Sequence, residues 1–291
     1  MKNVTHSVHQ KLLHIRDKTG EPFNHLLIRY GLERLLYRLV ASGHDNDFIL
    51  KGAMLFAIWQ NVPGRPTRDV DLLGFGEVSH NRFKKVFSDA CMVDIVDDGL
   101  TFDPNSVVTD DIRDEQEYFG IRVKLMGYLG KARIAIQIDV GFGDAIVPPP
   151  ETIEYPTILD FPAPCIRAYH PATVVAEKFN AMIVLGMMNS RLKDFYDVYM
   201  IIKHMNITDT QLGEAIMSTF ERRKTPLPIE LPLVFKEDYI IEGNKEIQWK
   251  AFLKRSLLSD CNLSFRQVVA SIQQRLWPIV SLLSKNNQTN F

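Results

Sequence analysis

Two aspartates, Asp69 and Asp71, are separated by a single apolar residue, Val70. Because successive side chains of a β-strand point to opposite faces, both carboxylates would project to the same side of a strand. At a separation of about 4 Å they would repel by roughly 4 kcal/mol at an effective dielectric constant of about 20. A bound cation relieves this repulsion, and carboxylate oxygens are the ligands that Mg²⁺ takes in phosphoryl- and nucleotidyl-transfer sites. The pair therefore indicates a metal site.

A third carboxylate, Asp139, lies on a stretch that has the period of a β-strand. In residues 133–140 a large apolar side chain recurs at every second position. The apolar face carries Ile134, Ile136, Ile138 and Val140. The opposite face carries Ala135, Gln137 and Asp139, and Asp139 is the charged residue of these three. An Asp-x-Asp pair alone is common by chance, but three carboxylates on adjacent strands would form a two-metal constellation.

The residues before the aspartate pair indicate a strand, a turn and a helix. Phe48-Ile49-Leu50 predicts a short buried strand, Gly52 a turn, and residues 53–59 a helix. A glycine at this point would allow backbone N–H groups to face a phosphate. Residues 62–67 then form the loop that leads to Asp69.

Helices and strands alternate over the first half of the chain. Helices are expected at 8–18, 22–42 and 80–90, strand edges and turns at 94–114, and a hairpin of 118–129 with 132–140 around Gly130. We interpret Arg29, Arg34 and Arg38 as solvated residues of a helix that covers the sheet, and Gly127 as a bulge. The aspartates of the 94–114 segment are interpreted as structural, because Asp in turns accepts hydrogen bonds from its own local backbone.

The character of the sequence changes at Pro148-Pro149-Pro150, beyond which we expect no further strands. Helices are predicted at 171–185, 190–204, 208–223, 245–258 and 264–284. The predicted fold is therefore α+β, with an N-terminal mixed sheet flanked by helices and an all-helical C-terminal domain. We place the domains at residues 1–165 and 166–291.

A second group of charged residues lies on two of the C-terminal helices. Lys178 precedes an apolar run, and Lys193, Asp194 and Asp197 are three or four residues apart, so that they would share a helix face. One interpretation is an ion pair on a solvated surface, which would contribute a few tenths of a kcal/mol. The other is a functional cluster, because a helix that is apolar on most sides does not usually carry unpaired charge.

The totals place limits on the class of protein. The net charge is −1, divided into −5 over residues 1–165 and +4 over the remainder. A basic second half fits a polyanionic partner, and a solvated helix face would give the same count. The isolated Cys91, Cys165 and Cys261, the polar N-terminus and the absence of an apolar run of ~18 residues predict a cytoplasmic protein with no membrane segment.

Two common nucleotide-binding motifs are missing. No Gly-x-x-x-x-Gly-Lys-Ser/Thr sequence is present, which argues against a P-loop NTPase. Gly141-Phe142-Gly143 lacks the third glycine of a dinucleotide-binding fingerprint and more plausibly turns the chain after the Asp139 strand.

These motifs, in this order, resemble the AbiEii/AbiGii toxin family of nucleotidyltransferase-like proteins in the DNA polymerase β superfamily. The resemblance covers about residues 48–200. It is carried by residues 48–52, 67–72, 138–144, 155–159, 176–179 and 189–197, including the Lys193-Asp194-x-x-Asp197 block. It implies a nucleotidyltransferase-like fold and a site for a nucleoside triphosphate.

The resemblance also implies a role for each residue. Asp69 and Asp71 would hold Mg²⁺ against the triphosphate, and Asp139 would complete the second metal position and help to deprotonate the acceptor hydroxyl. The residues that would bind or surround the phosphates are Lys51, Gly52, Arg68, Lys178, Arg191 and Lys193, with Asp194 and Asp197 orienting the cations. The turn in this sequence is Gly52-Ala53, whereas such transferases usually have Gly-Ser or Gly-Gly. This difference would weaken binding of the triphosphate or alter nucleotide specificity.

The function that the resemblance implies is Mg²⁺-dependent transfer of NMP from NTP to an acceptor. The acceptor would be RNA, such as a tRNA 3′ end, and the protein would be the toxin of a type IV toxin–antitoxin system in phage defence, checked by an antitoxin encoded nearby. Three alternatives remain open at this point. They are transfer to a small molecule or protein, a degenerate module that only binds nucleotide or a partner, and a metal-dependent nuclease.

Overall fold

The computed structural model describes residues 3–59, 62, 64–113, 119–242, 244–258 and 263–289. The strands are β1 (Phe48–Lys51), β2 (Asp69–Gly74), β3 (Leu100–Arg113), β4 (Phe119–Leu129), β5 (Ala132–Phe142), β6 (Glu151–Glu154) and β7 (Cys165–Ala168). The helices are α1 (Val4–Thr19), α2 (Phe23–Leu39), α3 (His80–Met92), α4 (Pro171–Leu185), α5 (Leu192–His204), α6 (Asp209–Arg222), α7 (Glu237–Glu242), α8 (Lys245–Arg255) and α9 (Phe265–Thr289). The fold is α+β, as predicted.

The chain forms two compact units, and neither is continuous in sequence. The first comprises Met1–Ile58, Pro66–Gly143 and Glu151–Ala168. The second comprises Trp59–Arg65, Asp144–Pro150 and Tyr169–Phe291. The division that we predict at residues 165 and 166 falls within β7.

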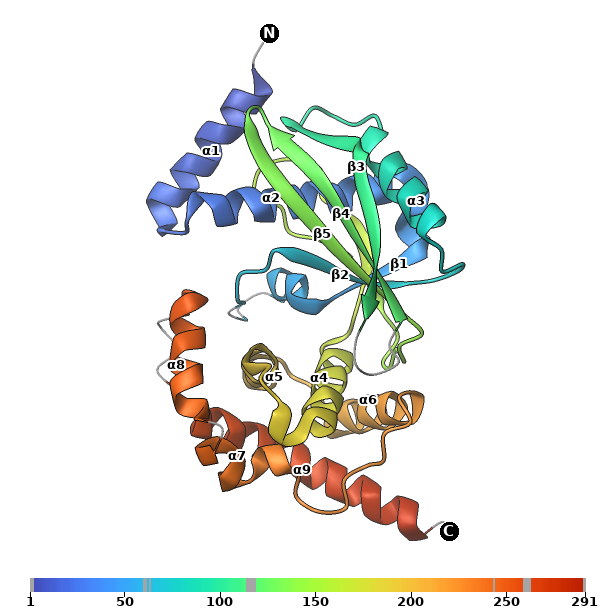
Figure 1. The fold of residues 1–291 in the computed structure, drawn as a ribbon, viewed down its shortest axis with the longest axis vertical. Coiled ribbons are helices and arrows are strands. Elements are labelled where there is room, and N and C mark those ends of the chain that lie inside the picture. Colours follow the sequence, from blue (N-terminus) through green and yellow to red (C-terminus); the bar gives the residue numbers. More distant parts are fainter. Residues whose placement is uncertain are drawn as a thin grey trace. The chain divides into compact units, whose positions relative to one another are not determined.

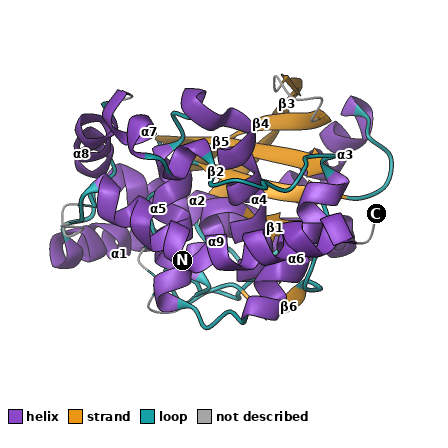
Figure 2. Cartoon of the chain, turned by 90° about the horizontal axis from the view of Figure 1, so that it is seen from below, coloured by secondary structure: helices purple, strands orange, loops and turns teal. Residues whose placement is uncertain are grey.

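The first unit is built on one seven-stranded sheet, in the order β3-β4-β5-β2-β1-β7-β6 (Figures 1 and 2). The sheet is mixed, because β2 pairs with β5 and β1 with β7 in parallel, while the other neighbours are antiparallel. Strand β2 therefore lies between β5 and β1. This order places the Asp69–Asp71 strand beside the strand that carries Asp139.

Alternation along β5 separates a buried face from an open one, as predicted. Ile134, Ile136, Ile138 and Val140 are at most 2% exposed. Helix α2 packs on this face, where a Cβ atom added at Gly31 would lie 3.0 Å from the Ile134 side chain. Helix α3 lies on the same face, with its Phe83 ring 5.7 Å from the ring of Phe142. The opposite face is the one that carries Asp139.

Two arginines of α2 are buried, which corrects the prediction that they are solvated. Arg34 and Arg38 donate hydrogen bonds to the carboxylate of Asp98 at 2.7–2.9 Å, and Asp98 is fully buried. Burial alone would raise the pKa of Asp98, but the hydrogen bonds from Arg38 and Arg34 hold it below its ordinary value. Asp98 also accepts from its local backbone at Leu100, as expected for a turn aspartate. The network fixes α2 to the segment that precedes β3.

Several predicted elements differ in detail. Residues Gly52–Ala57 form a 3₁₀ helix instead of an α-helix. Strands β6 and β7 lie beyond the proline run, so the expectation of no further strands is wrong. Gly127 is not a bulge, since it pairs in regular register; its missing side chain instead leaves room for the Phe102 ring. The register shift lies between Asp103 and Val108 on β3.

Within the described residues of Tyr169–Phe291, the second unit is helical apart from its connections. The five predicted helices are present as α4, α5, α6, α8 and α9. The side chain of His170 caps α4 by accepting from the Ala172 N–H, and Pro171 occupies the first turn, where its missing N–H costs nothing. The short α7 was not predicted. No helix in the described part of the chain combines the length and apolar character needed to cross a membrane.

Candidate active site

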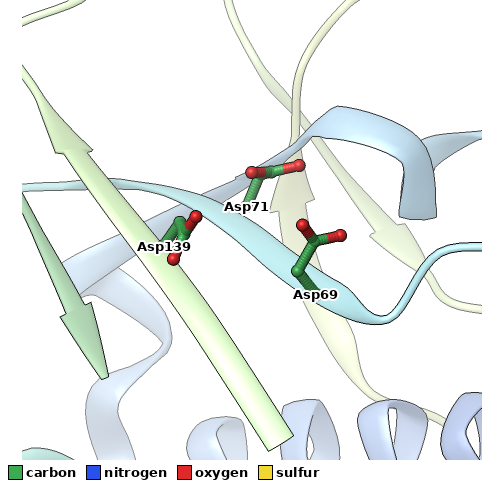
Figure 3. Close-up of side chains that lie close together, drawn as sticks. All are labelled: Asp69, Asp71 and Asp139. Atoms are coloured by element: carbon green, nitrogen blue, oxygen red, sulfur yellow. The ribbon is translucent and has the colours of Figure 1, made fainter. Parts of the chain in front are cut away.

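The three predicted carboxylates converge on the open face of the sheet (Figure 3). Asp71 on β2 is the direct register partner of Asp139 on β5, and Asp69 pairs with Gln137 two positions earlier. One carboxylate oxygen from each of Asp69, Asp71 and Asp139 lies within 4.8 Å of the others. All three residues are partly buried. Alternation puts the side chains on one face, and parallel pairing of β2 with β5 brings them together.

A row of four charged residues crosses the sheet at this point, with two carboxylates between two cations. Lys51 on β1 is the register partner of Asp71, and Arg122 on β4 is the register partner of Asp139. Side chains at paired positions lie on the same face of a sheet, so the row runs Lys51, Asp71, Asp139, Arg122. Arg122 donates from Nε and Nη2 to the two oxygens of Asp139, both at 2.7 Å. The hydrogen bond to Asp139 raises the pKa of Arg122. The carboxylates are therefore flanked by a cation on each side.

The loop before β2 holds the first aspartate of the pair. The Thr67 hydroxyl donates to a carboxylate oxygen of Asp69. Arg68, which we predict to contact nucleotide, lies immediately before the strand and is exposed. Thr67 thus fixes the side chain of Asp69 from within its own loop.

Gly52 is required by the position of Asp71. Its φ is +74°, in the region that L side chains rarely adopt. A Cβ atom added there would lie 1.9 Å from Oδ2 of Asp71. Absence of a side chain at residue 52 therefore leaves the space that this carboxylate occupies. Ala53 is buried behind the turn, at 5% exposure.

We expect Gly52→Ala to displace Asp71 and to lower nucleotide transfer by about a hundredfold, a loss typical of misplaced catalytic groups. It should also destabilise the fold by roughly 1–2 kcal/mol through the positive φ alone. Gly20→Ala is a matched control, because Gly20 has φ +75° but nothing within 4 Å of an added Cβ. Activity assays and urea unfolding of both variants separate the two effects. Equal loss of activity in both would contradict this account.

The second predicted group forms a buried ion-pair cluster in the second unit. Nζ of Lys178 lies 2.6 Å from Asp194 and 3.0 Å from Asp197. Arg65 pairs with the other oxygen of Asp197 at 3.2 Å. Burial alone would lower the pKa of Lys178, but the Asp194 and Asp197 carboxylates raise it above its ordinary value. The interpretation as a surface ion pair is wrong for these residues, because both aspartates are buried.

Lys193 and Arg191 lie outside this cluster. Both are exposed, although Lys193 was expected to share a face with Asp194 and Asp197. Arg191 donates its N–H to the side chain of Asn189 at 2.8 Å. The Asn189 carbonyl in turn accepts from Tyr239 Oη at 2.8 Å and from Lys245 Nζ at 2.7 Å. The start of α5 is therefore held from α7 and α8.

Lys245 is 4% exposed, and burial lowers its pKa below the ordinary value. We expect Lys245→Met to keep or raise the free energy of unfolding at pH 7, by up to about 2 kcal/mol, because methionine has a similar shape and no charge to desolvate. In the wild type, Lys245 binds its proton more tightly in the unfolded chain, where its pKa has the ordinary value of 10.5, than in the folded chain. The stability of the wild type relative to the variant should therefore rise as the pH approaches 10.5. Urea unfolding at pH 7 and pH 10 measures this. Lys250→Met, exposed on the same helix, should show neither effect.

Arg122 and Arg65 were not among the predicted site residues. A two-residue turn at Gly130-Lys131 pairs Leu129 with Ala132, and counting back along both strands from that turn would have placed Arg122 opposite Asp139. No comparable signal exists for Arg65, because its partner Asp197 is 132 residues away.

A family model described as "Nucleotidyl transferase AbiEii toxin, Type IV TA system" matches residues 34–271 of this chain. The chain belongs to the AbiEii family. The matched range of the AbiEii family model spans all the predicted site residues, from Lys51 to Asp197. No curated protein matches the sequence.

Two crystal structures from Helicobacter pylori are similar to this AbiEii-family chain over most of their length. One is that of JHP933, with 14% identity, 88% of this chain and 90% of that chain covered, and a TM-score of 0.47. The other, described as a "putative nucleotidyltransferase", has 13% identity, 92% and 96% coverage, and a TM-score of 0.49.

The carboxylate set has the chemistry of a divalent-metal site. Its donors are all carboxylate oxygens, which suit Mg²⁺ or Mn²⁺ rather than softer metals. Gly52 leaves room for the Asp71 carboxylate, so residue 52 does not displace this donor from the set. The residues present in this AbiEii-family protein therefore fit a divalent cation.

Proposed function

We propose that this protein is a Mg²⁺-dependent nucleotidyltransferase that moves the NMP unit of an NTP to an acceptor hydroxyl and releases pyrophosphate. One observation carries the proposal: Asp69, Asp71 and Asp139 converge on one sheet face in a chain of the AbiEii family. A bound divalent cation would supply charge neutralisation for the triphosphate. The reaction class is that of the family.

The roles of the chain's own groups follow from their positions. Asp69 and Asp71 would hold the cation, with Thr67 and Gly52 fixing the two carboxylates. Asp139 would orient the acceptor hydroxyl and draw its proton away. The acceptor O–H bond breaks, a P–O bond forms at the α-phosphorus, and the bond to the leaving pyrophosphate breaks.

The resemblance extends the proposal to the phosphates. Lys51 shares the carboxylate row, and Arg68 precedes β2, which supports assigning both to the nucleotide. Arg191 and Lys193 are exposed cations, suited to neutralise departing pyrophosphate. Lys178 is held by Asp194 and Asp197, so these aspartates would orient it rather than Arg191 or Lys193.

We propose RNA as the acceptor, with a tRNA 3′ end as the leading candidate, and a cognate antitoxin that limits the activity in the cell. The family description as a type IV toxin supports the second part. The net charge of +4 beyond residue 165 supports a polyanionic acceptor.

The test uses NTPs labelled at the α-phosphate, total tRNA and Mg²⁺. We expect label in RNA, none when the label is moved to the γ-phosphate, and none after chelation of the metal. The γ-label control separates nucleotide transfer from kinase activity, because only the α-phosphorus would stay with the acceptor.

Other outcomes identify the alternatives. Label on protein with none on RNA would contradict the RNA acceptor and support a protein substrate. Shortening of RNA without added NTP would support a nuclease. Nucleotide binding without any transfer, with every class of acceptor, would contradict catalysis and support a binding module.

A further inference from the structure

Arg122 donates hydrogen bonds to both carboxylate oxygens of Asp139. Its planar guanidinium forms a fork, with Nε on Oδ1 and Nη2 on Oδ2 of Asp139. Such bidentate pairs are the stronger and more directional ion pairs in proteins. The amide of Gln137 lies 3.3 and 3.4 Å from the same two oxygens. Asp139 is therefore already held by a cation and an amide on the open sheet face.

The charges of the three carboxylates and their neighbouring cations favour one divalent cation over two. Asp69, Asp71 and Asp139 contribute three negative charges, and Arg122 returns one positive charge at hydrogen-bonding distance. The remaining two negative charges match a single divalent cation. Lys51, the register partner of Asp71, adds a positive charge at the other end of the row. A second dication at Asp139 would have to share its oxygens with a guanidinium, which repels it.

We propose that Arg122 takes the place of a second metal ion at Asp139, so that the nucleotide-free protein holds one divalent cation, at Asp69 and Asp71. This inference rests on the proposed function and, for the nucleotide-free protein, differs from the two-metal constellation expected from the three carboxylates. Arg122 is a positioning residue in this scheme, because it acts through Asp139. It holds that carboxylate in place for the acceptor hydroxyl.

The test is the stoichiometry of Mn²⁺ binding without nucleotide, measured by titration of free Mn²⁺ by electron paramagnetic resonance. We expect one ion per wild-type chain. Arg122→Gln should bind a second ion, with an affinity at least tenfold higher than any second site of the wild type. Arg122→Lys keeps the charge and loses the fork, and should stay at one ion.

Lys124→Gln is the matched control. Lys124 lies two residues along the same strand and pairs with Asp110 at 2.9 Å, so its loss should leave Mn²⁺ binding unchanged. Combining Arg122→Gln with Asp139→Asn should return the stoichiometry to one, which places the second ion at Asp139. Circular dichroism of each variant checks that the sheet is retained.

Two results would overturn this inference alone: two ions of similar affinity in the wild type, or an Arg122→Gln curve that superimposes on the wild-type curve. The first of these results is measured on the wild type, so it does not depend on any variant being folded. Failure of the proposed function looks different, because the wild type would then transfer no labelled nucleotide to any acceptor, whatever its stoichiometry. A wild type that binds no Mn²⁺ would overturn both.

Discussion

Replacement of Asp71 by asparagine is expected to lower nucleotide transfer by about a thousandfold or more. Loss of a metal-holding carboxylate removes several kcal/mol of charge stabilisation, and each ~1.4 kcal/mol is tenfold in rate. Asparagine has nearly the same shape, so the fold should persist. Initial rates with α-labelled NTP measure the effect.

The stability of Asp71→Asn gives a second readout. Without divalent cations the variant should be at least as stable as the wild type, because one of three carboxylates within 4.8 Å no longer contributes charge. Added Mg²⁺ should raise the melting temperature of the wild type only, by mass action. Asp110→Asn, on the same sheet but paired with Lys124, is the control. A variant that retains a tenth or more of wild-type activity would refute the assignment of Asp71.

Lys178→Met is expected to destabilise the second unit by about 3–5 kcal/mol, the usual cost of removing one partner of a buried ion pair. The Asp194 and Asp197 side chains are 7% and 0% exposed. Burial alone would raise the pKa of Asp194, but Lys178 lowers it below the ordinary 3.8. Its contribution is therefore present above pH 3.8 and lost as pH falls below it, so the difference between variant and wild type should shrink in acid. Urea unfolding across pH measures this.

The exposed Lys193 provides the matched control for Lys178. Lys193→Met should change the free energy of unfolding by less than about 0.5 kcal/mol, as is usual for surface positions. If Lys193 contacts the triphosphate, the same variant should raise the KM for NTP. The double variant Lys178→Met with Asp194→Asn should recover part of the lost stability, because one uncompensated charge is removed. If Lys178→Met had the same free energy of unfolding as the wild type, the buried ion-pair cluster would not stabilise the fold.

The carboxylate face could be predicted because it depends on a period of two. Alternation along 133–140 is enough to place Asp139 opposite the buried isoleucines, and an Asp-x-Asp pair on any strand shares a face. The pairing of β2 with β5 is different, since residues 75–131 lie between the two strands and nothing local specifies their pairing. Their convergence could only be expected from the resemblance to a family.

The features that the sequence did not predict depend either on a partner distant in sequence or on an element too short to show a pattern. Arg34 and Arg38 resemble solvated helix residues until Asp98, 60 or more residues away, is placed beside them. Strands β6 and β7 have four residues each, too few for alternation to be distinguished from a loop. The turn at Gly52 was predicted correctly, but its close approach to Asp71 was not, because that approach depends on the β1–β2 register.

The backbone passes from one unit to the other five times along the sequence, at residues 58–59, 65–66, 143–144, 150–151 and 168–169. A single protease cleavage therefore cannot release either unit as an intact fragment. A truncated protein that ended at residue 165 would lack most of β7, the strand next to β1, and would carry residues 59–65 and 144–150 without the rest of their unit. Expression of the sheet alone should consequently give an insoluble or partly folded product, and dissection of this enzyme calls for point substitutions in the full-length chain.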